Sequence, residues 1–260
     1  MRVLALSDPH LAHATPGKEM DRFGEHWVRH PERIAAAWRE TVREQDVVLV
    51  PGDISWAMRL EQARPDLEFL AALPGTKILL KGNHDYWWQS VGKVRAVLPE
   101  RMFALQADAL RVGDVAFAGT RLWDVPEVRF GDLIDWQPNA DGSISAERTL
   151  DDEEQSRKVF RRELGRLRRA LAQLDRGPPT RDAPCKIVLT HYPPCGPDLE
   201  PTEVTELFES HDLRHSVFGH LHAVRRDRVP APFGEKRGIG YHLTSCDYVD
   251  FRPVLIEEVG

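Results

Sequence analysis

Short apolar runs rich in Val, Ile and Leu recur along the chain, and each ends abruptly in polar residues. Five of them lie at 3–8, 47–53, 77–85, 186–191 and 216–220, and two further runs lie at 238–245 and 253–259. Because the apolar stretches are continuous rather than alternating, the first five are typical of strands buried on both faces. The last two predict strands added to the same core.

Helical periodicity separates these predicted strands. Pro31 is favoured at the first position of a helix, and Ile34 and Trp38 follow it on one face. From about 151 to 175 the apolar residues step by four and three, which predicts an amphipathic helix. Strands that alternate with helices in this way predict an α/β fold.

The chain has 260 residues, a length that one domain with a large core can fill. It contains no internal repeat or low-complexity linker, so we expect residues 1–260 to form a single domain. The segment 124–149 has few apolar residues and contains Pro126, Gly131, Pro138 and Gly142. Loops of this length are usually functional, and we therefore expect an active-site loop insertion there.

Composition narrows the class of protein. The formal net charge of −6 gives no general attraction to nucleic acid or to an anionic membrane. The three cysteines are too few and too widely spaced for a disulfide framework or a zinc ribbon. The first apolar run is too short for a signal peptide, and no run is long enough to span a membrane. We expect a cytoplasmic protein with no membrane or stable nucleic-acid partner.

Polar residues capable of chemistry follow each of the five predicted buried strands. They are Asp8 and His10, then Asp53, then Asn83, His84 and Asp85, then His191, and finally His220 and His222. In α/β sheets, functional groups gather outside the carboxyl ends of the strands. Five of the eleven histidines occupy these positions, which favours one shared site over isolated turn residues.

The residue types in this set indicate a metal centre. Imidazole mixed with carboxylate and amide oxygen suits manganese, iron or zinc better than magnesium or calcium. Seven candidate ligands are too many for one tetrahedral ion, and a bridging carboxylate would divide them between two ions. The candidates are Asp8, His10, Asp53, Asn83, His191, His220 and His222.

The motifs SDPH, GD, GNHD, THYPP and GHLH, in this order, resemble the five-block signature of the calcineurin-like metallophosphoesterases. The resemblance spans residues 8–222 and fills every metal-binding position of the pattern. It implies an α/β fold of four layers, α/β/β/α, in which two mixed sheets are flanked by helices. It also implies a dinuclear metal centre at the edges of these sheets.

The resemblance implies a role for each motif residue. The first metal would be held by Asp8, His10, Asp53 and His222, and the second by Asp53, Asn83, His191 and His220, with Asp53 bridging the two. His84 would face the substrate phosphate, and Asp85 would orient the His84 imidazole. We expect two divalent ions as cofactors, with manganese favoured and iron, zinc or nickel as alternatives.

The implied activity is hydrolysis of a phosphate ester by a metal-bridging hydroxide. The runs GDISWA and GNHD depart from the pattern of protein serine/threonine phosphatases. We therefore expect a small phosphodiester or phosphomonoester as substrate, with the diester favoured and a nucleotide among the candidates. A nuclease and a non-catalytic scaffold are the alternatives, and the sequence does not indicate an oligomeric state.

Several residues near the motifs admit two interpretations. The aromatic residues Trp56, Tyr86, Trp87, Trp88 and Trp123 either pack against the following helices, which we favour, or form a rim that stacks a nucleobase. Two arginines, Arg59 and Arg121, are weaker candidates for phosphate contacts. We do not expect His26, His30 or Cys195 to act as ligands.

Overall fold

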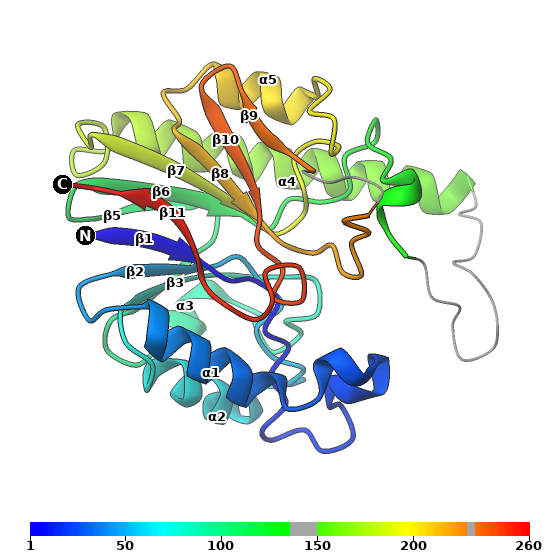
Figure 1. The fold of residues 1–260 in the computed structure, drawn as a ribbon. Coiled ribbons are helices and arrows are strands. Elements are labelled where there is room, and N and C mark those ends of the chain that lie inside the picture. The colour runs from blue at the N-terminus through cyan, green and yellow to red at the C-terminus, as the bar shows by residue number, and fades with distance from the viewer. Residues whose placement is uncertain (136–149, 228–231) are drawn as a thin grey trace.

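Two sheets lie face to face in the computed structural model, which describes residues 1–135, 150–227 and 232–260 (Figure 1). The first sheet has the strand order β11-β1-β2-β3-β4. Its strands are β1 (Arg2–Ala5), β2 (Val47–Val50), β3 (Thr76–Leu80), β4 (Met102–Leu105) and β11 (Val254–Glu258). Only β11 runs antiparallel to its neighbour, so four adjacent strands point their carboxyl ends to the same edge.

The second sheet has the strand order β5-β6-β7-β8-β10-β9. Its strands are β5 (Asp108–Val112), β6 (Val115–Thr120), β7 (Cys185–Thr190), β8 (His215–Phe218), β9 (Gly234–Lys236) and β10 (Ile239–Leu243). The four inner strands are parallel, whereas β5 and β9 pair antiparallel at the two edges. Both sheets are therefore mixed.

Helices cover the outer face of each sheet (Figure 1). The first sheet is covered by α1 (His30–Thr41), α2 (Leu60–Ala71) and α3 (Val91–Arg95), and the second by α4 (Leu150–Arg176) and α5 (Glu203–Glu209). Short 3-10 turns lie at Met20–Phe23, Glu25–Trp27 and Gly131–Leu133. The predicted four-layer α/β/β/α arrangement is confirmed.

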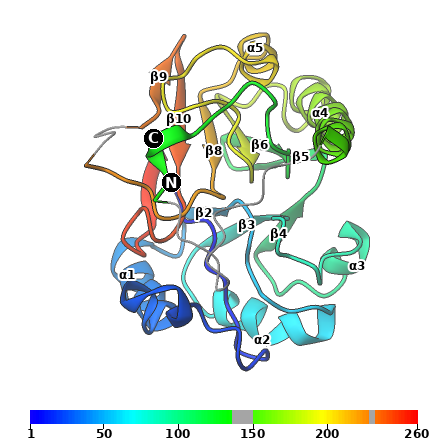
Figure 2. The same cartoon turned by 90° about the vertical axis from the view of Figure 1, so that its right-hand side faces the viewer.

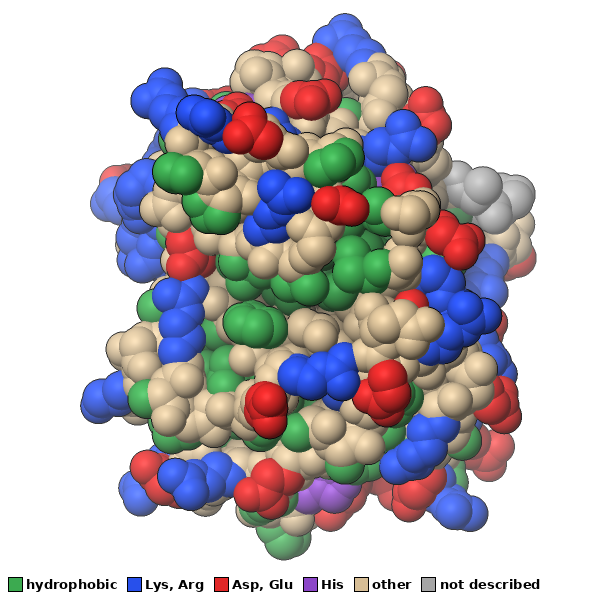
Figure 3. Space-filling view, turned by 90° about the vertical axis from the view of Figure 1, so that its left-hand side faces the viewer, with side chains coloured by type: hydrophobic (Ala, Val, Ile, Leu, Met, Phe, Trp, Pro, Cys, Tyr) green, Lys and Arg blue, Asp and Glu red, His purple; other side chains and the backbone are tan. Residues whose placement is uncertain are grey.

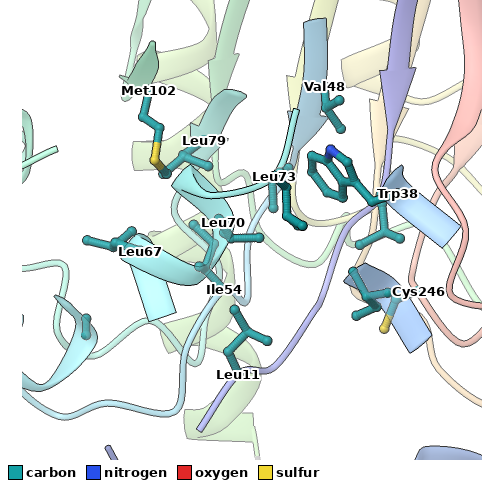
Figure 4. Close-up of a cluster of buried hydrophobic side chains, with 14 of the residues drawn as sticks. Leu11, Trp38, Val48, Ile54, Leu67, Leu70, Leu73, Leu79, Met102 and Cys246 are labelled. Carbon is teal, nitrogen blue, oxygen red and sulfur yellow. The ribbon is translucent and has the colours of Figure 1, made fainter. Parts of the chain in front are cut away.

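Three apolar cores hold these layers together. Between the sheets, Val3 and Leu49 of the first sheet belong to the same buried cluster as Phe117 and Leu189 of the second. A second core lies between the first sheet and its helices, where Trp38 of α1 packs with residues of α2, β2 and β3 (Figure 4). The third joins the second sheet to the apolar stripe of α4.

The predicted elements are confirmed more fully than their boundaries. Each predicted buried strand is present, but it ends before the motif that follows it, so the motif residues lie in turns. The helix predicted from about 151 to 175 spans 150–176, and the helix predicted at Pro31 spans 30–41. Four strands, β4, β5, β6 and β9, were not predicted. Within the expected loop insertion, residues 136–149 lie outside the described residues.

The amino and carboxyl ends of the chain meet at the edge of the molecule opposite the motif turns (Figure 1). The Met1 amino group donates a hydrogen bond to the Val259 carbonyl at 2.9 Å. On this face, Lys and Arg side chains are interspersed with Asp and Glu around a band of apolar side chains (Figure 3). Neither charge dominates, so this face offers no extended basic surface to nucleic acid. No helix in the described ranges is long and apolar enough to cross a bilayer.

Trp38 gives a test of the packing between α1 and the first sheet. Its side chain is fully buried, and its indole N–H donates to the Pro74 carbonyl at 2.9 Å. We expect Trp38→Ala to lower the free energy of unfolding by about 3–5 kcal/mol, because it leaves a large cavity and an unpaired carbonyl. Urea denaturation measures the loss, with Phe103→Ala as the control because Phe103 is 44% exposed. A loss below about 1 kcal/mol for Trp38→Ala would contradict this packing.

Candidate metal centre

The turns that carry the motifs lie at the edge where the parallel strands of both sheets end (Figure 2). The first sheet contributes the turns after β1, β2 and β3, and the second sheet contributes the turns after β7 and β8. The seven predicted ligands form two groups that share one carboxylate.

The first group consists of Asp8, His10, His222 and one oxygen of Asp53. The Nε2 atoms of His10 and His222 lie 3.1 Å apart. Asp8 Oδ1 is 3.8 Å from His222 Nε2, and Asp53 Oδ2 is 3.8 Å from His10 Nε2. All four donor atoms therefore face a common point.

The second group consists of Asn83, His191, His220 and the same oxygen of Asp53. Asn83 Oδ1 lies 2.6 Å from His191 Nε2 and 3.1 Å from His220 Nδ1. Asp53 Oδ2 lies 3.5 Å from His191 Nε2. This one oxygen is thus within 4 Å of a histidine in each group.

These spacings fit the coordination of divalent ions. Ligands bound to one ion at 2.0–2.2 Å lie about 3.0–3.5 Å from each other, close to the separations within each group. The carboxylate and imidazole atoms of Asp8, His10 and His222 all lie within 4.8 Å of one another, as do those of Asp8, Asp53 and His191. The residues present therefore fit the binding of divalent metal.

The outward-facing ring nitrogens orient two of the imidazoles for ligation. His191 Nδ1 donates to the Pro51 carbonyl at 2.9 Å, and His222 Nδ1 donates to Asp247 Oδ1 at 2.8 Å. His191 Nδ1 holds the proton of its ring, so His191 Nε2 presents a lone pair to its group. Despite burial, Asp247, Asp8 and Asp53 raise the pKa of His222 to about 9, so without a bound cation both of its ring nitrogens are protonated. Metal-binding histidines are typically held in this way by a carbonyl or a carboxylate.

Because the side chains of this cluster are buried, their charged forms are destabilised unless cations are bound. Burial raises the pKa of Asp8 to about 6, and burial together with the nearby Asp8 and Asp85 raises the pKa of Asp53 well above its usual value. Burial also lowers the pKa of His10 and of His191 well below the usual value. Buried carboxylates beside imidazoles that are neutral, except for His222, are an environment that divalent cations would stabilise.

The backbone of the motif turns is strained. Asp8, His10, Asp53 and His220 have φ values of 56°, 43°, 51° and 73°, in the left-handed region that non-glycine residues seldom adopt. Such strain persists only where the surrounding structure imposes it, and it is often found at functional sites.

Glycine is required beside two of these turns because the chains approach closely. A Cβ atom added to Gly82 would overlap the carboxylate of Asp53, and one added to Gly219 would overlap Ser7 and Asp8. The glycines of the GNHD and GHLH motifs thus let two turns pack against the carboxylates that the centre shares.

His84 lies at the opening of this centre. Its backbone N–H donates to Asp53 Oδ1 at 2.8 Å, which leaves Oδ2 facing both groups. Its ring lies against Trp56 at a centroid distance of 4.6 Å and edge-on to Tyr86 at 6.2 Å. Burial lowers the pKa of the imidazole, and the nearby charges of His222 and Lys18 lower it further. His84 is therefore neutral near pH 7 before substrate binds.

The structure corrects the role expected for Asp85. This buried carboxylate does not orient His84, whose Nδ1 has no hydrogen-bond partner among the described residues. Its Oδ1 instead accepts from the backbone N–H groups of Ile54 and Ser55, and its Oδ2 accepts from that of Gly82. Because these donors are backbone groups of two neighbouring turns, Asp85 fixes the turn that carries Asp53 to its own turn.

Two residues near the centre were missed by the sequence analysis. Asp247 holds His222, as a carboxylate commonly holds a metal-binding imidazole, and it follows β10 outside any recognised motif. The available signal was its position after the predicted strand at 238–245. Lys18 lies on the long connection after β1, where its Nζ donates to the Trp56 carbonyl at 3.2 Å. No periodicity or motif marks that connection.

The structure separates the two interpretations of the aromatic residues. Trp87 and Trp88 are fully buried in the core and cannot stack a ligand. Trp123 packs against Tyr192 and donates to Ser156 Oγ at 2.9 Å. The two aromatic residues left beside the opening are Trp56, which stacks on His10, and Tyr86, which is 50% exposed.

The side chains of the weaker candidates are engaged with other groups. Arg121 pairs with Glu163 at 3.7 Å, and its guanidinium lies over the Trp123 ring. The ring nitrogens of His30 face the carbonyls of Pro9 and Trp27. Burial raises the pKa of the Cys195 thiol to about 12, which leaves it protonated and a poor ligand.

Comparisons with known proteins place the chain among phosphoesterases. A family model described as calcineurin-like phosphoesterase matches residues 1–224. The Gene 66 protein of Mycobacterium phage D29 is 38% identical over 79 residues, which span 30% of this chain and only 38% of that protein. Two solved structures align over 98% of this chain and 95% of their own. They are the protein of unknown function AQ665 from Aquifex aeolicus (TM-score 0.43, 14% identity) and the phosphopantetheinyl hydrolase PptH from Mycobacterium tuberculosis (TM-score 0.46, 15% identity).

Asp247 allows a test of the centre that leaves its predicted ligands intact. We expect Asp247→Ala to weaken the binding of manganese by about 10–100-fold, because His222 loses the carboxylate that fixes its proton and orientation. Calorimetric titration of the metal-stripped protein with Mn²⁺ measures the change. Asp250→Ala is the matched control, since the Asp250 side chain is 81% exposed. Equal affinity in Asp247→Ala and the wild type would exclude His222 as a ligand held by Asp247.

Proposed function

The chain belongs to the calcineurin-like phosphoesterase family, and from this premise we propose that it hydrolyses small phosphate esters with two divalent metal ions. The observation that carries the proposal is the position of Asp53 Oδ2, within 4 Å of His10 in one group of donors and of His191 in the other. A carboxylate oxygen placed in this way is suited to bridge two ions.

Each predicted ligand has a definite place in this proposal. The first ion would be held by Asp8, His10, Asp53 and His222, and the second by Asp53, Asn83, His191 and His220. When bound, the ions would polarise the phosphoryl oxygens and make water more acidic. Manganese is the ion we favour, because the donor set mixes imidazole with oxygen ligands.

His84 is the residue we propose to act on the leaving oxygen. A neutral imidazole keeps one N–H and can donate a hydrogen bond to that oxygen. An anionic phosphate next to the ring would favour its protonated form and so oppose the effect of burial on the pKa. Trp56 and Tyr86 flank the ring and restrict its orientation, since Asp85 does not hold it.

Lys18 places a positive charge near His84. Lys18 is close enough to His84 to lower its pKa, and its ammonium lies 5.9 Å from the centroid of the Trp56 ring. Arg121, the other cation considered for phosphate contact, is already paired with Glu163. The Lys18 ammonium would add one positive charge to those of the two ions beside the bound phosphate.

The proposal is tested by hydrolysis of bis(p-nitrophenyl) phosphate and p-nitrophenyl phosphate by the metal-stripped protein, with and without Mn²⁺. We expect manganese-dependent turnover with the diester preferred. Asp53→Ala should lose both metal binding and turnover, because it removes the shared ligand, whereas the exposed Asp182→Ala should keep both. Full turnover in Asp53→Ala, or turnover unaffected by metal in the wild type, would refute the proposal.

His84 separates catalysis from metal binding. We expect His84→Ala to bind Mn²⁺ as the wild type does and to lower kcat by about 10²–10⁴-fold, the usual contribution of a positioned acid or base. The loss should be smaller for p-nitrophenolate, a good leaving group, than for a poorer one such as the phenolate released from methyl phenyl phosphate. A His84→Ala protein that loses its metals would instead make His84 part of the metal centre.

A further inference from the structure

A cavity of about 390 Å³ opens beside the second group of donors. It lies between the turn at 124–130, the first described turns of α4 and the residues that follow His191. Its size is within the range of small-molecule sites, which is about 300–1,000 Å³. None of the catalytic or metal-binding roles proposed above uses it.

The wall of this cavity is continuous with the proposed metal centre. Tyr192 lines the cavity, and its ring packs on the His220 ring at a centroid distance of 4.0 Å and edge-on to His191 at 5.4 Å. Trp123 packs on Tyr192 at 4.9 Å and is tied to Ser156 of α4. Tyr192 thus both lines the cavity and contacts two predicted ligands, so the cavity lies one side chain away from the proposed metal centre.

The apolar part of the lining comes largely from the 124–130 turn. Val125, Val128 and Phe130 all belong to or pack against the apolar core beneath the second sheet. Pro126 and Pro193 complete this part of the lining. A rigid apolar surface of this kind favours a ring-sized organic group over a chain of charged groups.

The charged part of the lining is balanced. Two acidic residues, Asp124 and Glu153, face two arginines, Arg129 and Arg157. The Arg129 guanidinium donates to the carbonyls of Pro126 and Val128 at 2.7 Å each, so it is bound to its own turn. A lining with no net charge gives no preference for a polyanion, which disfavours a polynucleotide or a polyphosphate in this cavity.

We propose that this cavity is the subsite for the organic group of the phosphate ester, and that it takes an uncharged group of about the size of one or two fused rings. The inference rests on the proposed function, since it assumes that the phosphate is bound at the metals. It narrows the substrate class from small phosphate esters in general to esters of a bulky, largely apolar alcohol.

The test uses phosphonates, because their carbon–phosphorus bond leaves no ester to hydrolyse. Titration calorimetry of the manganese-loaded protein compares the Kd values of 1-naphthylphosphonate and methylphosphonate. We expect the naphthyl probe to bind at least about tenfold more tightly, because only its ring system can fill the cavity. Val128→Trp, which fills the cavity, should abolish this preference and leave the Kd of methylphosphonate unchanged.

A second variant and a control keep the result interpretable. Phe130→Ala removes part of the apolar wall instead of adding bulk. It should weaken the binding of the naphthyl probe and leave the Kd of methylphosphonate unchanged. Leu255→Trp adds the same bulk at a residue of β11 that is 54% exposed, and it should keep the wild-type preference. Equal affinities of the two probes in the wild type, or a preference that both cavity variants retain, would overturn the subsite.

The inference and the proposed function can fail separately. Metal-dependent hydrolysis of p-nitrophenyl esters together with equal phosphonate affinities would keep the phosphohydrolase and reject the subsite. The opposite outcome is a protein that hydrolyses neither ester but prefers the naphthyl probe, with Val128→Trp abolishing the preference. That outcome would support the subsite and refute the proposed hydrolase activity.

Discussion

The packing of the two sheets against each other is the constraint on which the proposed centre depends, because neither sheet carries a complete group of donors. The first sheet supplies Asp8, His10, Asp53 and Asn83, and the second supplies His191, His220 and His222. Each group therefore closes only when the sheets meet in one register. The core between them, with Val3, Leu49, Phe117 and Leu189 all fully or nearly fully buried, fixes that register. The apolar core that holds the two sheets together therefore also positions the residues of the site.

Bringing these residues together destabilises the fold locally in two ways. Asp8 and Asp53 are buried at the same edge, and four motif residues adopt left-handed backbone angles. Each of these features is unfavourable alone, since buried carboxylates repel and strained backbone costs on the order of 1–3 kcal/mol per residue. The hydrophobic layers on either side supply stability that offsets this cost. Divalent ions at the edge would remove the electrostatic part of it.

The elements that could be predicted are those whose own residues form a recognisable apolar pattern. The strands β1, β2, β3, β7 and β8 are continuous apolar runs because both faces are buried, and α4 has an apolar stripe because only one face is. Two of the four missed strands, β5 and β9, lack such signals for physical reasons, whereas β6 is a fully buried run, VAFAGT, that carries the same signal. Every residue of β5 is only partly buried, and β9 is a three-residue edge strand, GEK, without an apolar side chain. Each of the two pairs with the strand that follows it in a short antiparallel hairpin, so its place in the sheet comes from that partner and not from an apolar pattern of its own.

The same reasoning explains which site residues could be predicted. The motif residues are recognisable because each follows a strand directly, and the turn after a buried parallel strand leads to the common edge. The roles of the two non-ligand aspartates depend on contacts that no local pattern encodes. Asp85 stands next to His84 in the sequence, yet its carboxylate points back to the amides of Gly82, Ile54 and Ser55. Adjacency along the chain was a poor guide to adjacency of side chains.

Asp247 shows the opposite, that residues far apart in the sequence can have interacting side chains. It lies 25 residues beyond His222 and outside every motif, yet its carboxylate accepts the Nδ1 proton of that imidazole. Strand β10 pairs with β8 in parallel, so the residues that follow the two strands emerge at the same edge. The structure thus gives Asp85, which lies in a motif, the role of joining two turns. It gives Asp247, which lies outside the motifs, the role of supporting a predicted ligand. Since a carboxylate performs either task, its neighbours in space decide which one it performs.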